Sequence, residues 1–511
     1  MAFSRRSLLV LCSILAVSFS CGLNMPAGVS ISRSEKMSAQ GLQRFLDSSP
    51  EPHHATYQSV KKLKELKFEE LDERHCWKDK IKAGGRYFFQ RDPVLGSSVV
   101  AFVVGGKFDP SSEKSGGFKV LGAHTDSPNL RVKPRSARSA SGCLQLDVET
   151  YGGGLWHTWF DRDLSIAGKV VIRNDDGVVE QRLVNLERPI LRIPNLAIHL
   201  QTAAEREAFK VNKEDHLQPI LATEVKKTLE GAAPPPPSPT SSDAWQKAQS
   251  PLLLTLLGSS LGVDPSSICD FTLSLYDVQP SSLSGAYDEF ITSARIDNLF
   301  GCYVSLEALL EYVRDGEDVE DEDISVVALF DHEEVGSSST QGAGSTLIND
   351  AVGRITRALD LEGRGDQEAR VRRSMVVSFD MAHALHPNYP SKHEKYHDPK
   401  INEGVVIKTN SNQRYASNLV TTFISREIGR SVGREVQEFV VRNDCPCGST
   451  IGPIISSLTG MQAVDVGTPQ LSMHSIREMA GVKDVSLSIE WMKAFLKEFR
   501  RIECTIQPSS N

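Results

Sequence analysis

The chain has little cysteine and no excess of positive charge, and these two shortages exclude several classes of protein. Nine cysteines in 511 residues are too few for a disulfide framework and are typical of a reducing compartment. Acidic residues (65) outnumber Lys and Arg (57), so that the net charge is −8 and no basic field exists to hold nucleic acid. We therefore expect a protein that acts on small molecules or peptides, with no nucleic-acid partner.

Long apolar runs are also scarce. One such run covers residues 8–19, behind two arginines and ahead of small residues, which is the layout of a secretory signal. It is too short to span a membrane comfortably, and we expect no membrane contact elsewhere. Met37 lies downstream, so a wrongly chosen start codon explains this region equally well. We therefore predict that residues 1–40 are an N-terminal extension, either signal-like or mis-started.

Several short apolar runs are typical of β-strands buried on both faces. Residues 118–123, 326–330 and 375–379 are such runs, each ending at polar or small residues. Segments of helical periodicity lie between strands, and the apolar spacing over 485–499 predicts an amphipathic helix that packs on a sheet. This alternation predicts an α/β fold with a mixed sheet.

The middle of the chain has a different pattern. Apolar and polar side chains alternate there between glycine-rich turns, which predicts antiparallel strands rather than βαβ units. The segment 233–242 is rich in proline and serine and is expected to be an exposed loop or linker. We predict a smaller β-rich domain at 132–276, inserted into a catalytic α/β domain made of 41–131 and 277–511.

Ionisable side chains follow the predicted strands where each strand ends. Ligands of open α/β sheets bind just beyond the carboxyl ends of the strands. One further acid starts a helical pattern, and one further histidine lies in the loop after the last strand. The same edge of the sheet would collect six such side chains: His124, Asp297, Glu333, Glu334, Asp380 and His474.

This set of imidazoles and carboxylates without a thiolate suits Zn²⁺, Mn²⁺ or Co²⁺ better than copper or an iron–sulfur cluster. Singly, each residue has an ordinary role, such as helix N-capping for Asp297. Two-metal hydrolases commonly use a carboxylate that bridges both ions. A glutamate that stays off the metal can then act as general base on a bridging water. Glu333 and Glu334 are the candidates to divide these roles.

The sequence resembles the aspartyl aminopeptidases, family M18 of the metallopeptidases, in the larger clan of dinuclear zinc aminopeptidases. The likeness runs from about residue 40 to residue 499. It leaves out the N-terminal extension and the proline-rich segment. Seven blocks in the family's order carry it: GAHTDSPNLRVKP (122–134), YGGGLWHTWFDRDL (151–164), GAYDEFITSARIDNL (285–299), DHEEVGS (331–337), DMAHALHPNY (380–389), IKTNSNQRYAS (407–417) and TPQLSMHSIREM (468–479).

The resemblance implies a centre of two Zn²⁺ per subunit, in which Mn²⁺ or Co²⁺ can substitute. Asp297 would be the bridging carboxylate. His124 and Asp380 would complete one zinc site, and Glu334 and His474 the other. The implied activity is hydrolysis of the N-terminal peptide bond.

The resemblance also assigns the residues around the metals. Glu333 would be the general base that activates the metal-bridged water, and Asp126 would orient His124. At His332 some relatives have Asn, from which we expect a minor effect.

Members of the family prefer an N-terminal Asp or Glu, and a pocket for an acidic side chain needs a fixed cation or several donors. Block matching makes Lys408 the best candidate, with His383 and Tyr415 nearby. His157 matches a residue that reaches the site from a neighbouring subunit. The family commonly assembles as dodecamers and resides in the cytoplasm. The secretory pathway or an organelle is the alternative if the signal-like start is real.

Two other functions stay open. A broader-specificity aminopeptidase or a carboxypeptidase of the same clan would share the metal ligands and differ in the pocket. A catalytically silent scaffold would keep the fold and the metal shell. One motif is left over: Cys445 and Cys447 flank a proline. Without a second cysteine pair, we interpret it as a tight turn rather than as a metal or redox motif.

Overall fold

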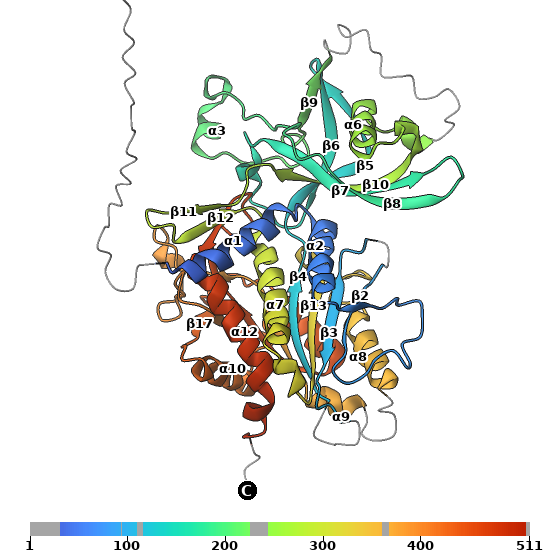
Figure 1. Ribbon diagram of the computed structural model, residues 1–511. Helices are drawn as coiled ribbons and strands as arrows, with labels where there is room; N and C mark the ends of the chain where they lie inside the picture. Colours follow the sequence, from blue (N-terminus) through green and yellow to red (C-terminus); the bar gives the residue numbers. More distant parts are fainter. Residues whose placement is uncertain (1–30, 93–94, 110–115, 225–243, 360–366, 507–511) are drawn as a thin grey trace, which may run out of the picture.

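The computed structural model describes residues 31–92, 95–109, 116–224, 244–359 and 367–506. These residues form three β-sheets with helices packed against them (Figure 1). The signal-like run and the proline-rich segment 233–242 lie outside the described residues. Within the described part, no helix is both long and apolar enough to cross a membrane.

The largest sheet has nine strands of mixed direction, which confirms the predicted mixed-sheet α/β fold. Its four neighbouring strands β13, β4, β14 and β18 are parallel. In spatial order the strands are β1 (Glu69–Glu70), β2 (Arg86–Gln90), β3 (Val99–Val104), β13 (Ile324–Phe330), β4 (Phe118–His124), β14 (Met375–Phe379), β18 (Gln462–Gly467), β16 (Val406–Thr409) and β17 (Gln437–Val440).

Both faces of this sheet are buried, because successive side chains of a strand point to opposite faces. On β13, Val327 and Leu329 join one core, whereas Val326 and Phe330 join the other. The first core takes in helices α1 (Arg33–Asp47), α2 (Pro52–Glu65), α7 (Ile296–Arg314), α10 (Leu419–Ser431) and α12 (Val482–Glu503). The second takes in α8 (Leu347–Ala358), α9 (Gln367–Arg372) and α11 (Ile451–Thr459).

A second sheet of six antiparallel strands stands above the large sheet in Figure 1. Helix α6 (Pro251–Leu261) packs Leu253 and Leu257 against its core, and the short helices α3 (Ala203–Glu207) and α5 (Ala244–Lys247) lie in the same region. We interpret this unit as the inserted domain. Its strands in spatial order are β8 (Val179–Asn185), β7 (Leu164–Arg173), β10 (Ile268–Asp277), β5 (Asn129–Ala140), β6 (Cys143–Tyr151) and β9 (Ile220–Thr223).

A third, small sheet was not predicted. Its strands have two to four residues, too few to show a periodic pattern in the sequence. It joins segments far apart in the chain and thereby positions the loop that carries His474. Its strands in spatial order are β11 (Ser282–Ser284), β12 (Phe290–Ser293), β20 (Glu478–Gly481), β19 (Pro469–Leu471) and β15 (Ala382–His383).

The first described helix begins inside the segment 1–40 that the sequence pattern indicates as an N-terminal extension. Helix α1 begins at Arg33, and Met37 lies inside it. A capping box starts the helix: the Ser32 side chain accepts from the main-chain N–H of Glu35, and the Glu35 side chain accepts from that of Ser32. Ala39 is already buried in the core. Residues 33–40 therefore belong to the folded part of the chain.

Candidate metal centre

Three neighbouring parallel strands bring predicted site residues to one edge of the large sheet. His124 is the last residue of β4 and pairs with Phe330, the last residue of β13. Asp380 directly follows β14, on the other side of β4. Glu333 and Glu334 start a short 3-10 turn just beyond β13. The carboxyl ends of these strands thus place four side chains together, as the sequence predicted.

Asp297 and His474 reach the same edge from outside the large sheet. Asp297 lies in the first turn of α7, where its φ of −81° and ψ of 108° are not helical. No side chain caps this helix, so Asp297 does not have the ordinary N-cap role. His474 lies between β19 and β20, with φ at 66° in the left-handed region. Both irregular backbone positions direct their side chains to the strand ends.

The site residues form two groups that share Asp297. In the first, Nε2 of His124 lies 3.5 Å from Oδ1 of Asp297 and 3.5 Å from Oδ1 of Asp380. In the second, Nε2 of His474 lies 3.5 Å from Oδ2 of Asp297 and 3.3 Å from Oε1 of Glu334. Among the described residues, these are the two clusters of His, Cys, Asp and Glu side chains with the geometry to hold a metal ion.

The spacing within each group fits zinc. Ordinary N–H···O hydrogen bonds are about 2.7–3.2 Å long, and all four distances are longer. Two ligands about 2.0–2.1 Å from a tetrahedral zinc ion lie roughly 3.4 Å apart. Oδ1 of Asp297 and Oε1 of Glu334 are buried without a hydrogen-bond partner, which is costly. A metal ion in each group would satisfy these atoms, since Oδ1 of Asp297 faces His124 and Oε1 of Glu334 faces His474.

The buried histidines and carboxylates of the centre shift one another's pKa values. Burial disfavours the imidazolium of His474, but the Asp297 and Glu334 carboxylates raise the pKa of His474 to about 12. Burial likewise opposes charge on His124, whose pKa the surrounding carboxylates nevertheless raise well above its usual value. Burial raises the pKa of Glu334 to about 7. The metal-free centre therefore binds protons, which zinc binding would release.

Glu333 lies beside the first group without belonging to either. Its Oε2 is 3.9 Å from Nε2 of His124. Burial raises the pKa of Glu333 well above its usual value; the charge of His124 opposes this rise, and the Asp380 carboxylate adds to it. A carboxylate that lies beside the ligand groups and belongs to neither is placed to accept and return a proton.

Asp126 positions more than the one residue predicted from the sequence. The Nδ1 atom of His124 lies 3.0 Å from the main-chain carbonyl of Asp126 and 3.4 Å from its Oδ1. The carboxylate accepts hydrogen bonds from the main-chain N–H groups of Glu333 and Glu334, both at 3.0 Å. It also accepts one from the hydroxyl of Tyr151 at 2.7 Å. Asp126 thus fixes the turn that carries both glutamates.

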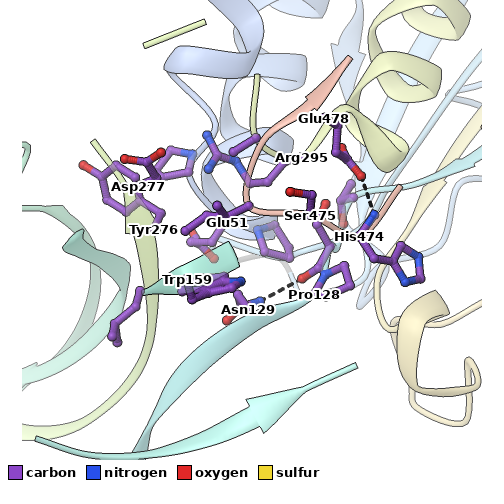
Figure 2. Close-up of a pocket in the computed structure, with 17 residues that line it drawn as sticks. Glu51, Pro128, Asn129, Trp159, Tyr276, Asp277, Arg295, His474, Ser475 and Glu478 are labelled. Carbon is purple, nitrogen blue, oxygen red and sulfur yellow. Dashed lines mark hydrogen bonds between the residues drawn. The ribbon is translucent and has the colours of Figure 1, made fainter. Parts of the chain in front are cut away.

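Glu478, which was not predicted, holds the two ligands that come from outside the large sheet. Its Oε2 accepts from the main-chain N–H of Asp297 at 2.9 Å, and its Oε1 accepts from that of His474 at 2.8 Å. Figure 2 shows the second bond, at the wall of a cavity of about 20 Å³ that Glu51 and Arg295 also line. The side chain of Glu478 is buried. Partners of this kind fix ligand orientation.

Lys408 lies on β16, next to a metal ligand. Its buried Nζ donates to Oδ2 of Asp380 at 3.3 Å and to the main-chain carbonyl of Met381 at 3.2 Å. The ring of Tyr415 has its centroid 5.1 Å from Nζ. Lys408 is therefore no surface lysine, and Tyr415 lies beside it as the resemblance implies.

Of the other two predicted substrate residues, His383 lies near Lys408: burial, and after it the charge of Lys408, lower the pKa of His383. His383, on β15, contacts the ring of Phe439 and lines a pocket of about 410 Å³ with it. His157 is exposed on the 3-10 helix η1 (Trp156–Trp159). None of the contacts found in the described part of the chain joins His157 to the metal ligands.

Comparison with known proteins decides the family. The family model described as Aminopeptidase I zinc metalloprotease (M18) matches residues 45–496. The chain belongs to the M18 family. The probable aspartyl aminopeptidase of Ricinus communis is 47% identical over 481 residues, which cover 91% of this chain and 96% of that protein. The aspartyl aminopeptidase of Dictyostelium discoideum is 43% identical over 474 residues, covering 90% and 96%. The chain is thus a zinc-dependent aminopeptidase, an exopeptidase among the hydrolases.

Solved structures of M18 proteins share the fold. The cryo-electron microscopy structure of the Ape4 and Nbr1 complex matches with a TM-score of 0.87 at 39% identity, covering 93% of this chain and 88% of that one. The mApe1 dodecamer of S. cerevisiae matches with a TM-score of 0.79 at 29% identity, covering 93% and 99%. The predicted family and fold class are confirmed.

Proposed function

We propose that this M18 enzyme removes N-terminal Asp or Glu from peptides, at a centre that holds two zinc ions. The position of Asp297 carries the proposal, because its Oδ1 faces His124 and its Oδ2 faces His474. A carboxylate placed between two ligand groups in this way is the usual bridge of two-metal hydrolases. The names of the relatives, which are aspartyl aminopeptidases, support the acidic preference.

The two groups of side chains would each hold one ion. His124 and Asp380 complete one site, and Glu334 and His474 the other, with Asp297 shared. Each group then offers three protein ligands, which leaves a position open, as in catalytic zinc sites. Zinc held there would polarise the scissile carbonyl and lower the pKa of a water. Mn²⁺ or Co²⁺ can provide the same Lewis acidity.

Glu333 performs the proton transfers. It takes a proton from the attacking water and returns it to the leaving amine, so that one carboxyl group serves as base and then as acid. Asp126 supports this role because it accepts from the main-chain N–H of Glu333. This hydrogen bond holds the backbone of Glu333 in place. The carboxyl group of Glu333 belongs to neither ligand group.

Lys408 supplies the cation for the acidic side chain of the substrate. An ammonium group has three donors, and two of those on Lys408 go to Asp380 and Met381. The third is available to a substrate carboxylate. Tyr415 and His383 complete this pocket in the proposal.

We further propose that the protein forms a homo-oligomer of the same kind as the mApe1 dodecamer. In such an assembly the exposed His157 would reach the site of a neighbouring subunit. The seven cysteines of the described residues are free thiols, which supports a reducing compartment and hence the cytoplasm.

Paired substrates test the proposal. Purified enzyme would be assayed on Asp-arylamide and Leu-arylamide, with a chelator and with zinc or cobalt added back. The proposal expects chelator-sensitive release that strongly favours the Asp substrate. Chelator-sensitive release that favours Leu would discard the acidic pocket and leave a broader-specificity aminopeptidase. Metal-loaded protein inactive on both substrates would indicate a silent scaffold.

A further inference from the structure

The Cys445–Pro446–Cys447 motif lies in the loop between β17 and α11, on the wall of the 410 Å³ pocket that His383 also lines. Cys445 lines this pocket directly, and both cysteines are partly exposed free thiols. Small reagents that enter the pocket can therefore reach Cys445. The turn that holds it is fixed by a hydrogen bond from the Cys445 N–H to the carbonyl of Arg442.

Cys447 contacts the proposed substrate pocket from behind. It packs against a buried cluster to which Tyr415 and Phe439 belong. Tyr415 is thus held in a cluster whose packing includes the Cys447 side chain. The Tyr415 ring in turn lies 5.1 Å from Nζ of Lys408. A displacement of the Cys447 sulfur would therefore affect Lys408, the cation proposed to bind the acidic side chain, through the Tyr415 ring.

The two thiols are better suited to redox chemistry than to metal binding. Structural zinc needs four ligands, and among the described residues neither thiol belongs to a cluster that could hold a metal ion. Two consecutive Cα–Cα steps of about 3.8 Å keep the Cα atoms of Cys445 and Cys447 within roughly 7 Å of each other. A disulfide needs about 4.4–6.8 Å, so a modest bend at Pro446 is enough.

We propose that Cys445 and Cys447 form a redox modification site for small-molecule disulfides, and that the disulfide between them weakens the binding of acidic substrates. The Cys445 thiolate attacks one sulfur of the small disulfide, forming a mixed disulfide and releasing one small thiol. The Cys447 thiolate then attacks the Cys445 sulfur and releases the second small thiol. The protein loses two hydrogens and two electrons, and the small disulfide gains them.

The disulfide draws the Cys447 sulfur toward Cys445 and away from the cluster that contains Tyr415. The Tyr415 ring then loses part of its packing and is less firmly held beside Lys408. Weakening the interaction of Lys408 with the substrate carboxylate by the equivalent of one hydrogen bond corresponds to a rise in KM of roughly two- to tenfold. The metal ligands are untouched, so we expect kcat to change little. This part of the inference rests on the proposed function, because it concerns the same acidic pocket.

Oxidised glutathione provides the test on the full-length, zinc-loaded enzyme. The tryptic peptide 443–477 contains Cys445 and Cys447 and no other cysteine, so mass spectrometry reads their state without any assay of activity. We expect the peptide to become lighter by two hydrogens. In the same samples, KM for Asp-arylamide should rise and return after reduction with a phosphine.

Two variants serve as controls. Cys445→Ser should keep the KM of the reduced enzyme and lose the response to oxidised glutathione. Cys504→Ser, at an exposed cysteine elsewhere, should respond like the wild type. A peptide that stays reduced, or stops at a glutathione adduct, would overturn the inference, and so would an unchanged KM after disulfide formation. If the reduced enzyme does not prefer Asp, it is the proposed function that fails, whereas the mass reading still tests the disulfide.

Discussion

The two carboxylate oxygens of Glu478 accept one hydrogen bond each from the main-chain N–H groups of Asp297 and His474. One buried side chain therefore fixes the backbone of Asp297, which both groups share, and of His474 in the second group. Both oxygens must be acceptors for this, because both partners are donors. A carboxylate meets this requirement and an amide does not.

Glu478→Gln should weaken zinc binding. The amide NH₂ would face one of the two main-chain N–H groups, so that one hydrogen bond is lost. Outer-shell partners of metal ligands typically contribute roughly 10- to 100-fold in affinity, and we expect a loss of this size. Competition with a chromophoric chelator measures it. Glu490→Gln, at the partly exposed Arg434–Glu490 pair, is the control and should leave the affinity unchanged. Wild-type affinity in Glu478→Gln would contradict the assigned role.

Lys408→Met should reduce the preference for acidic substrates. The variant keeps an apolar stem of similar length and removes the buried cation beside Asp380. Hydrogen bonds to charged groups contribute about 1.5–3 kcal/mol, so the ratio of kcat/KM for Asp- over Leu-arylamide should fall roughly 10- to 100-fold. The ratio is the appropriate readout because an effect on Asp380 would act on both substrates. Lys400→Met, at an exposed lysine, should not change the ratio. An unchanged ratio in Lys408→Met would exclude Lys408 as the specificity residue.

The charge of Glu51 should make the free energy of unfolding depend on pH in the acidic range. Glu51 caps α2 by accepting from the main-chain N–H groups of His53 and His54, and it is buried. Burial opposes its ionisation, but the two histidines and these donors lower the pKa of Glu51 from 4.5 to about 2. A pKa that is lower in the folded state contributes stability above about pH 4.5, and this contribution is lost as the pH falls toward 2.

Glu51→Gln should therefore be less stable than the wild type near pH 5.5, by up to roughly 3 kcal/mol if the whole pKa difference counts. The gap should close between about pH 4.5 and 2. Urea unfolding of the metal-free protein over a pH series measures both. Glu65→Gln, at an exposed position of the same helix, should show neither effect. A gap that does not change with pH would mean that packing, rather than the charge of Glu51, stabilises this helix.

The sequence pattern predicted those parts of the site that follow from local chemistry. His124, Glu333, Glu334 and Asp380 follow apolar runs, and the ends of parallel strands necessarily meet at one edge of the sheet. For the same reason, the large sheet and its two buried faces could be predicted from the runs themselves.

Hydrogen bonds between a side chain and a main-chain group far away in the sequence could not be predicted in this way. Glu478 bonds to Asp297 across 181 residues, and Asp126 bonds to the backbone of Glu333 across 207. Neither contact leaves a periodic signal. Helix α1 begins inside the segment 1–40 because a capping box at Ser32 starts it, several residues before its first buried side chain.

The most direct measurement of the central claim is the zinc content and the turnover of Glu333→Gln. We predict two zinc ions per chain, as in the wild type, because Glu333 belongs to neither ligand group. We also predict that kcat on Asp-arylamide falls by roughly 10²- to 10⁴-fold, since an amide cannot transfer the proton. Near-normal turnover, or a variant that loses its zinc, would contradict the separation of base and ligands on which the account depends.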